Sequence, residues 1–193
     1  LGVRKGDRVV FFFDKSLFFL IAHLAVQKIG AVSVPLNPGF KKSEMAYLLG
    51  DVKAGLVLCG PGQEPMIREI DPGMKTLVID PLEPYQDLNL FKSFSEVFSP
   101  ADIRAEDPAV IIYTSGTTGK PKGAVLTQSN LFHDAKNIIQ IWEITVSDVL
   151  CHALPLFHVH GMCFALHTSL IAGAHVVMLD AFSPETVIPL LLE

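Results

Sequence analysis

One stretch just past the middle of the chain concentrates glycine, hydroxyl and lysine residues. Residues 113–123 have the sequence YTSGTTGKPKG and are called here the Gly/Lys loop. Glycines let backbone N–H groups approach an anion closely, hydroxyls donate further hydrogen bonds, and lysines add positive charge. This composition predicts a loop that binds phosphate groups.

The spacing within the Gly/Lys loop differs from that of the Walker phosphate-binding loop. The Walker pattern needs four residues between its glycines and Ser or Thr after the lysine. Here only two residues separate Gly116 from Gly119, and Pro121 follows Lys120. On composition alone, a solvated Gly/Thr-rich loop without a ligand is an equally good interpretation, because short motif matches produce false positives.

A second group of residues that could take part in a reaction follows residues 149–154. Residues 154–161 have the sequence LPLFHVHG and lie between an apolar stretch and a second apolar stretch, residues 161–171. Histidine can act as a proton donor or acceptor near neutral pH. A single histidine, however, is more often a structural residue, and both interpretations stay open for His158 and His160 on the residues alone.

The Gly/Lys loop resembles the signature loop of the adenylate-forming enzymes, which include acyl-CoA synthetases, luciferases and peptide-synthetase adenylation domains. Residues 2–7, 28–38 and 154–158 look like further landmarks of that family, in the usual order. The resemblance therefore covers nearly the whole chain. It implies ATP, Mg²⁺ and coenzyme A as reactants or cofactors. In the family reaction a carboxylate attacks the α-phosphate of ATP, and a thiol then displaces AMP.

The resemblance also implies roles for individual residues. The groups that would bind the β- and γ-phosphates are Thr114, Ser115, Gly116, Thr117, Thr118, Gly119, Lys120 and Lys122. His158 would be the catalytic residue, beside the adenylated carboxyl group. The residues that would line the substrate pocket are Phe157, His160, Gly161 and Met162. Where the family usually has histidine after residues 125–127, this chain has Gln128, which can still form hydrogen bonds.

Hydrophobic periodicity predicts the elements that position these residues in the first part of the chain. Residues 8–13, 31–34, 56–59 and 76–79 are short apolar runs typical of buried parallel strands. Helices are expected over residues 17–29, 43–49 and 64–70. Ser16 is the expected cap of the first helix, and Gly30 and Gly50 are the expected stops of the first two.

The second part of the chain continues this alternation. Residues 109–112 predict a strand that leads into the Gly/Lys loop, and residues 127–142 predict the following helix, with Thr127 as its N-cap. A strand over 149–154, a helix over 161–171 and a strand over 174–179 come next. Ser183 and Pro184 predict a last helix that kinks or breaks early at Pro189.

The expected fold class is α/β: a partial N-terminal domain of an adenylate-forming enzyme, with two mostly parallel α/β halves. The expected divisions are residues 1–80, a linker or surface excursion over 81–108 with one short helix near 91–98, and residues 109–193. The linker is inferred from its prolines and scattered acidic residues.

Composition narrows the possible partners and locations. The chain has 193 residues, of which 50% are hydrophobic and 18% charged, so a folded domain is expected. A net charge of −5 gives no support for nucleic-acid binding. Residues 17–26 are too short to span a bilayer, which takes about 20 residues. Three cysteines without metal-ligand spacing suit a reducing compartment, and a cytoplasmic protein is expected. No metal site is predicted, and the remaining histidines are interpreted as structural.

The resemblance also implies what the chain lacks. The family's segment for adenine and Mg²⁺, the aspartate that binds ribose, the hinge and the C-terminal domain with its catalytic lysine have no counterpart in residues 1–193. We therefore expect a fragment of an acid–CoA ligase, of the malonyl-CoA or fatty acyl-CoA synthetase branch, that is inactive alone and self-associates through exposed apolar surface. An adenylating enzyme with another acceptor and a noncatalytic nucleotide-binding scaffold are the alternatives.

Overall fold

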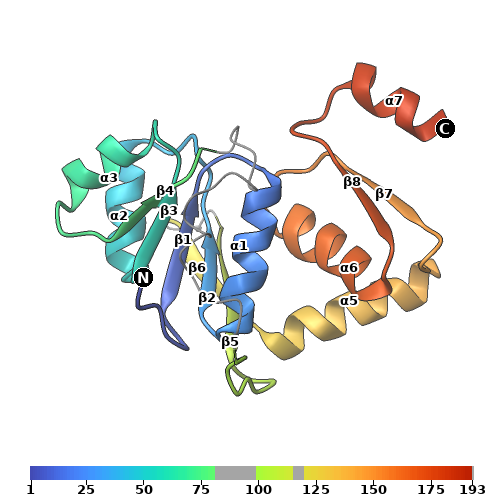
Figure 1. Cartoon of the computed structure of the whole chain (residues 1–193), viewed down its shortest axis with the longest axis horizontal. Helices are drawn as coiled ribbons and strands as arrows, with labels where there is room; N and C mark the ends of the chain where they lie inside the picture. The colour runs from blue at the N-terminus through green and yellow to red at the C-terminus, as the bar shows by residue number, and fades with distance from the viewer. Residues whose placement is uncertain (81–98, 115–119, 193) are drawn as a thin grey trace. The chain divides into compact units, whose positions relative to one another are not determined.

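The computed structural model describes residues 1–80, 99–114 and 120–192. The chain divides into two compact units, residues 1–126 and 127–193. Figure 1 shows the elements in colours that run from blue at the N-terminus to red at the C-terminus. None of the described helices combines the length and apolar character needed to cross a bilayer.

The first unit is built on a mostly parallel sheet. Within the described residues the strand order is β4-β3-β1-β2-β5-β6. Strands β1 and β2, β1 and β3, β3 and β4, and β2 and β5 pair in parallel. The bounds are β1 (Arg8–Phe12), β2 (Val32–Pro35), β3 (Leu56–Cys59), β4 (Thr76–Val78), β5 (Pro108–Thr114) and β6 (Lys122–Thr127). The mostly parallel α/β architecture predicted from the sequence is confirmed.

Both faces of strand β1 are covered, as its continuous apolar sequence predicts. Phe11 packs against Phe19 of helix α1 (Leu17–Lys28), with ring centroids 4.9 Å apart. Val10 and Phe12 belong instead to the buried cluster that includes Met45 of helix α2 (Lys42–Val52). Because successive side chains of a strand point to opposite faces, α1 and α2 cover opposite faces of the sheet.

Helix termini agree with the sequence prediction in one case and differ in another. Ser16 caps α1, because its Oγ accepts a hydrogen bond from the backbone N–H of Phe19 at 3.2 Å. The predicted stop at Gly50 was wrong: α2 runs through Gly50 and ends at Lys53, which has a left-handed φ of 50°. Val52, beyond the glycine, is buried, so packing of the following turn keeps the chain helical.

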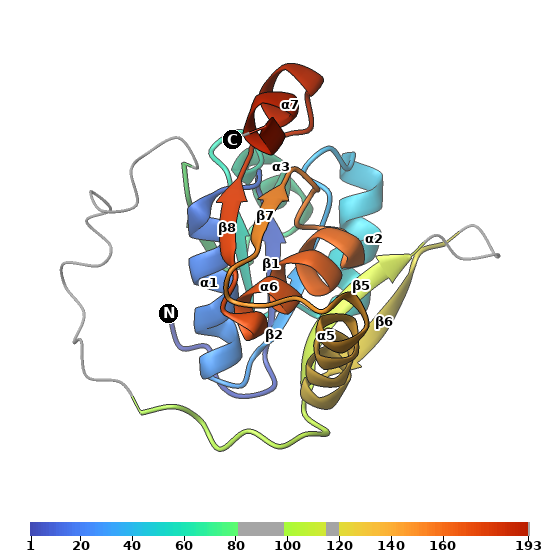
Figure 2. The same cartoon turned by 90° about the vertical axis from the view of Figure 1, so that its right-hand side faces the viewer.

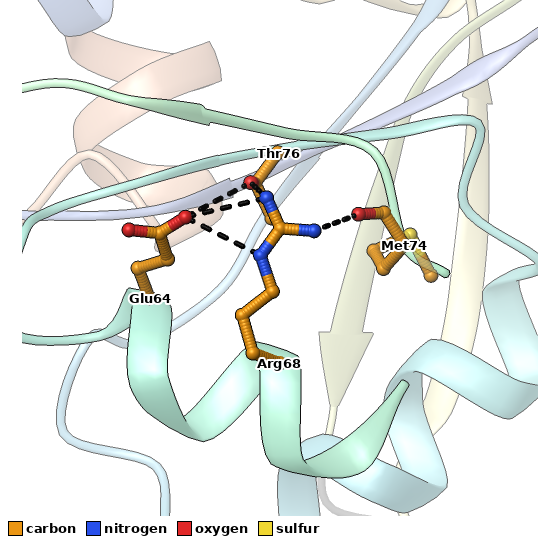
Figure 3. Close-up of polar contacts among 4 residues, drawn as sticks. All are labelled: Glu64, Arg68, Met74 and Thr76. Atoms are coloured by element: carbon orange, nitrogen blue, oxygen red, sulfur yellow. Dashed lines mark hydrogen bonds and ion pairs between the residues drawn. The ribbon is translucent and has the colours of Figure 1, made fainter. Parts of the chain in front are cut away.

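Helix α3 (Glu64–Ile70) is tied to strand β4 by an exposed polar network (Figure 3). The guanidinium group of Arg68 donates to Glu64 Oε1 at 3.3 Å, to the carbonyl oxygen of Met74 at 2.8 Å and to Thr76 Oγ1. Exposed ion pairs of this kind each stabilise a protein by only about 0.2–1 kcal/mol. The network orients a connection and does not resemble a binding site.

The Gly/Lys loop joins two strands, whereas the sequence predicted that it joins a strand to a helix. Residues Lys122–Thr127 form β6, which lies next to β5 and runs in the opposite direction (Figure 2). The strand was missed because its residues are mostly exposed and carry no buried alternation. Since β5 pairs with β2 through Ser33 and Val110, the first sheet extends through residue 127.

This pairing places β5 and most of β6 in the first compact unit. The prediction placed a linker at residues 81–108, of which 81–98 lie outside the described residues. The compact units divide after Leu126, because β5 and β6 extend the sheet of the first unit.

The second unit pairs two parallel strands with helices. Val149 pairs with His175, and His152 pairs with Met178. Helices α5, η2 and α6 contact one another. The bounds are α5 (Gln128–Trp142), β7 (Val149–His152), the π-helix η2 (His160–His167), α6 (Thr168–Ala172), β8 (His175–Met178) and α7 (Pro184–Leu192).

The helices of the second unit confirm one sequence prediction and correct two. Thr127 caps α5 as predicted: its Oγ1 accepts from the backbone N–H of Asn130 at 3.2 Å. The helix predicted over 161–171 is present, but its first part is π-helical. Of the kink or early break predicted at Pro189, the early break was wrong, because α7 continues through it to Leu192.

Candidate functional site

The two ends of the Gly/Lys loop meet where β5 stops and β6 starts. Thr114 is the last residue of β5 and Lys122 the first of β6. Thr114 Oγ1 donates a long hydrogen bond, 3.5 Å, to the carbonyl oxygen of Lys122. Lys120 and Lys122 are exposed, so their ammonium groups are accessible to an anion. The predicted phosphate-binding residues 115–119 lie outside the described residues.

Helix α2 contacts both ends of the loop. Asp51 Oδ2 accepts a hydrogen bond of 2.6 Å from the hydroxyl of Tyr113, the first residue of the loop. Tyr47 donates a hydrogen bond of 3.0 Å to the carbonyl oxygen of Pro121, near the end of the loop. The Nζ of Lys120 lies 5.4 Å from the centroid of the Tyr47 ring. Sequence reasoning missed Tyr47 and Asp51; their only signal was a spacing of one helical turn.

The phenol of Tyr113 stays protonated at neutral pH. Burial, together with the hydrogen bond and the charge of Asp51, raises the pKa of Tyr113 well above its usual value. Tyr113 therefore keeps its proton at physiological pH and donates a hydrogen bond to Asp51. The contact is a hydrogen bond from a neutral donor to a charged acceptor, which is stronger than one between two neutral groups.

A glycine in β6 makes room for the Tyr113 ring. A Cβ at Gly123 would lie 2.8 Å from Ile111 Cγ2 and 3.3 Å from Tyr113 Cζ. Real Cβ atoms do not approach neighbours as closely as 2.8 Å, so any larger residue at 123 would displace the Ile111 side chain or the strand. The last glycine of the motif therefore has a packing role beside β5.

In the second unit, the segment from Leu154 to Gly161 is folded tightly back on itself. A Cβ at Gly161 would lie 2.1 Å from the carbonyl oxygen of Pro155. The buried His152 places its Nε2 2.8 Å from the carbonyl oxygen of Gly161. Because a carbonyl oxygen can only accept, Nε2 carries the proton. His152 and Gly161 thus fix the turn that presents His158.

The predicted pocket residues differ in accessibility within the second unit. His158 and His160 are exposed, and Phe157 is half-buried with its ring centroid 4.6 Å from that of His158. Gly161 and Met162 are buried. The backbone N–H of Met162 donates to the carbonyl oxygen of His158 at 3.0 Å, so the buried residue anchors the exposed one.

Three other ionisable groups, His167, Cys59 and Cys163, have pKa values shifted by burial toward the neutral form. Burial lowers the pKa of His167 to about 4, so this imidazole is neutral at pH 7. Burial raises the pKa of Cys59 to about 11 and that of Cys163 to about 12, which keeps both thiols protonated. Across residues 1–80, 99–114 and 120–192, no His, Cys, Asp and Glu side chains are grouped as a metal site.

Comparison with known proteins defines the class to which this fold and this loop belong. A family model described as "AMP-binding enzyme" matches residues 1–192, and the chain belongs to this family. The resemblance to adenylate-forming enzymes and the predicted fold class are confirmed by this match and by the structural comparison below.

Individual relatives are CoA ligases. The chain is 36% identical over 200 residues to oxalate–CoA ligase from Arabidopsis thaliana, covering 97% of this chain and 38% of that protein. It is 33% identical over 190 residues to human mitochondrial malonate–CoA ligase ACSF3, covering 96% of this chain and 32% of that protein. The crystal structure of ATP-bound MatB from Rhodopseudomonas palustris superposes with a TM-score of 0.93 at 34% identity. That match covers 100% of this chain and 39% of MatB, so the chain spans well under half the length of these relatives.

Proposed function

We propose that residues 1–193 are part of an ATP-dependent carboxylic acid–CoA ligase. In the first half-reaction the substrate carboxylate attacks the α-phosphate of ATP, forming an acyl-adenylate and releasing pyrophosphate. In the second, the thiol of coenzyme A attacks the acyl carbonyl and releases AMP. The observation that carries the proposal is the family match over residues 1–192, which includes a complete Gly/Lys loop.

The role proposed for the Gly/Lys loop is to bind the β- and γ-phosphates of ATP. An anionic carboxylate must approach a polyanion, so the first step requires positive charge and preorganised hydrogen-bond donors. Exposed Lys120 and Lys122 supply that charge, and Thr114 supplies a hydroxyl. Residues 115–119 are proposed to donate further hydrogen bonds. Mg²⁺, when bound with ATP, would neutralise additional phosphate charge.

The role proposed for the segment around His158 is to contact the carboxylate substrate. Its exposed imidazole can donate a hydrogen bond to a carboxylate oxygen. Phe157, His160, Gly161 and Met162 are proposed to shape the surrounding pocket, the last two from buried positions. A small carboxylate is the proposed substrate, in keeping with the acids in the names of the oxalate and malonate ligases.

The function is tested with the full-length protein that carries this chain. It is incubated with ATP, Mg²⁺ and a panel of acids that includes oxalate, malonate and a fatty acid, with and without coenzyme A. We expect ATP–pyrophosphate exchange that depends on one acid and needs no coenzyme A, and thioester formation when coenzyme A is added. Exchange without a thioester product would indicate another acceptor, and ATP binding without exchange would indicate a noncatalytic scaffold.

The role of the loop is tested with Lys122→Ala. Loss of one preorganised group at a developing charge typically costs about 10²–10³ in rate, so we expect pyrophosphate exchange to fall by about that factor. Thioester formation from a supplied acyl-adenylate should change much less, since no triphosphate is bound in that step. Lys75→Ala, which removes another exposed lysine of the first unit, is the control and should leave both steps unchanged.

A cytoplasmic location is part of the proposal. All three cysteines are free in the structure, which suits a reducing compartment. Cell fractionation followed by immunoblotting for the protein tests this location. Recovery with the mitochondrial fraction would contradict it, and the name of ACSF3 places that relative in mitochondria.

A further inference from the structure

Helix α2 presents two side chains, one turn apart, to the two ends of the Gly/Lys loop. Tyr47 and Asp51 are four residues apart and therefore lie on the same face of the helix. Asp51 accepts the hydrogen bond from Tyr113 on the strand that enters the loop. Tyr47 contacts Lys120 and Pro121, where the chain leaves the loop and enters β6. Tyr47, Asp51 and Tyr113, together with Pro121, to which Tyr47 donates, all belong to the first compact unit.

Two interactions converge on Tyr47, and they use different parts of its side chain. The hydroxyl donates to the carbonyl oxygen of Pro121 at 3.0 Å, and the ring lies 5.4 Å from the Nζ of Lys120. A lysine ammonium within about 6 Å of an aromatic centroid is attracted by the negative face of the ring. Tyr47 therefore restrains both the backbone and a charged side chain at the exit of the loop.

The helix that carries these groups is itself firmly packed. Met45, Leu48, Leu49 and Val52 of α2 are all buried in the core cluster that includes Val10 and Phe12 of β1. A helix held in this way keeps Tyr47 and Asp51 at fixed positions relative to the sheet. The loop ends are thus attached to the protein core through α2 as well as through the pairing of β5 and β6.

We propose that Tyr47 and Asp51 are positioning residues that hold the two ends of the Gly/Lys loop, and with them Lys120 and Lys122, ready to receive the triphosphate of ATP. The inference rests on the proposed function of the loop and adds residues outside the motif to it. Its physical basis is preorganisation: groups that are already in place when the ligand arrives need no ordering on binding.

The first test replaces the hydroxyls in the full-length protein. Tyr47→Phe and Tyr113→Phe each remove one hydrogen bond but keep the ring. Because a hydrogen bond between neutral groups typically changes an equilibrium by about 2- to 12-fold, we expect the KM for ATP in pyrophosphate exchange to rise by about that factor in Tyr47→Phe. The rise should be larger in Tyr113→Phe, whose hydrogen bond ends on a carboxylate. The KM for the acid should stay unchanged. A merely structural defect would instead lower kcat through loss of folded enzyme and leave both KM values unaltered.

The second test separates the two parts of Tyr47. Tyr47→Leu removes the ring as well as the hydroxyl, so it should raise the KM for ATP by a further factor of about 2 to 5 beyond Tyr47→Phe, the usual size of an exposed cation–π contact. Tyr47→Phe therefore gives partial rescue relative to Tyr47→Leu. Equal KM values in the two variants would contradict a role for the ring.

The third test is a double-mutant cycle. Asp51→Ala and Tyr113→Phe break the same hydrogen bond, so the double variant should be no worse than the single ones. Tyr47→Phe and Tyr113→Phe break separate bonds at opposite ends of the loop, so their effects on the KM for ATP should multiply. Ser43→Ala, on an exposed part of the same helix, is the control and should match the wild type.

The outcome of Lys122→Ala distinguishes the two levels of the proposal. If Lys122→Ala lowers exchange while the Tyr47, Asp51 and Tyr113 variants keep the wild-type KM for ATP, the positioning role is overturned and the function of the loop stands. If Lys122→Ala leaves exchange unchanged, both fail. Increased KM values for ATP in these variants, together with slower pyrophosphate exchange in Lys122→Ala, support both the positioning role and the function of the loop.

Discussion

Individual residues hold the turn that presents His158, and position 161 in this turn requires glycine. A Cβ at Gly161 would lie 2.1 Å from the carbonyl oxygen of Pro155. The position of a Cβ is fixed by its own backbone, and the oxygen is a backbone atom, so no side-chain rotation can relieve the clash. Overpacking a buried position typically costs about 1–3 kcal/mol, and a backbone clash belongs at the upper end. The fold of this turn therefore depends on residue 161 having no side chain.

We predict that Gly161→Ala lowers the free energy of unfolding of the full-length protein by about 3 kcal/mol. Gly50→Ala is the matched control, because Gly50 lies within α2 with open space where its Cβ would be. Alanine in a helix interior is favoured over glycine by about 0.5–1 kcal/mol, so this variant should be more stable than the wild type. Chemical denaturation measures both, and equal stability of the two variants would contradict the prediction.

The buried His167 makes stability depend on pH. Its pKa is lowered to about 4 by burial, while an unfolded histidine has a pKa of about 6.5. Between these values the unfolded chain binds more protons than the folded one, so stability falls as the pH drops from about 6.5 to about 4. The loss reaches about 3 kcal/mol at the lower end, and above pH 6.5 the residue contributes no pH dependence.

We predict that His167→Gln reduces this loss of stability between about pH 6.5 and about pH 4. Urea denaturation at a series of pH values gives the slope. His133→Gln, at an exposed position of α5, is the control and should keep the wild-type slope. An unchanged slope in His167→Gln would show that other groups cause the acid sensitivity.

At the scale of elements, the sequence predicted the buried ones well. The continuous apolar run of β1 and the helix predicted over residues 127–142 follow from burial, and the structure confirms both elements, with Leu131, Ala135 and Ile138 buried in α5. Where burial is weak, the pattern weakens too. The exposed strand β6 was missed for that reason, and α2 continued past Gly50 because tertiary packing overrides local propensity.

The candidate site was predictable to a different degree. The motif identified the residues that could bind an anion, because anion binding requires particular residue types in a short stretch. The supporting residues were not identified. Tyr47 and Asp51 are separated from the loop by more than sixty positions, and only the fold brings them to its ends. The role of His152 likewise depends on a contact with Gly161 that spacing alone does not reveal.

At the scale of the whole molecule, the described residues leave much apolar surface exposed. None of the residues of α7 is buried, and Leu191 is 68% exposed. Elsewhere in the second unit, Trp142 is 62% and Phe182 67% exposed. The first unit has an apolar cavity of about 540 Å³ whose lining includes Val3, Phe18 and Leu77. Surfaces of this kind favour association with other apolar surfaces.

We predict that residues 1–193, produced alone, self-associate and form no acyl-adenylate. The chain spans 38% of oxalate–CoA ligase and 39% of MatB, so most of the length of such a ligase lies outside it. Size-exclusion chromatography with light scattering should show a mass that rises with concentration. Phe182→Ser together with Leu191→Ser should lower that mass, because both side chains are exposed and apolar.

The same preparation should show no ATP–pyrophosphate exchange with an acid that the full-length protein uses. A monomer that supports exchange would show that the segments needed for adenylation are all contained in these residues.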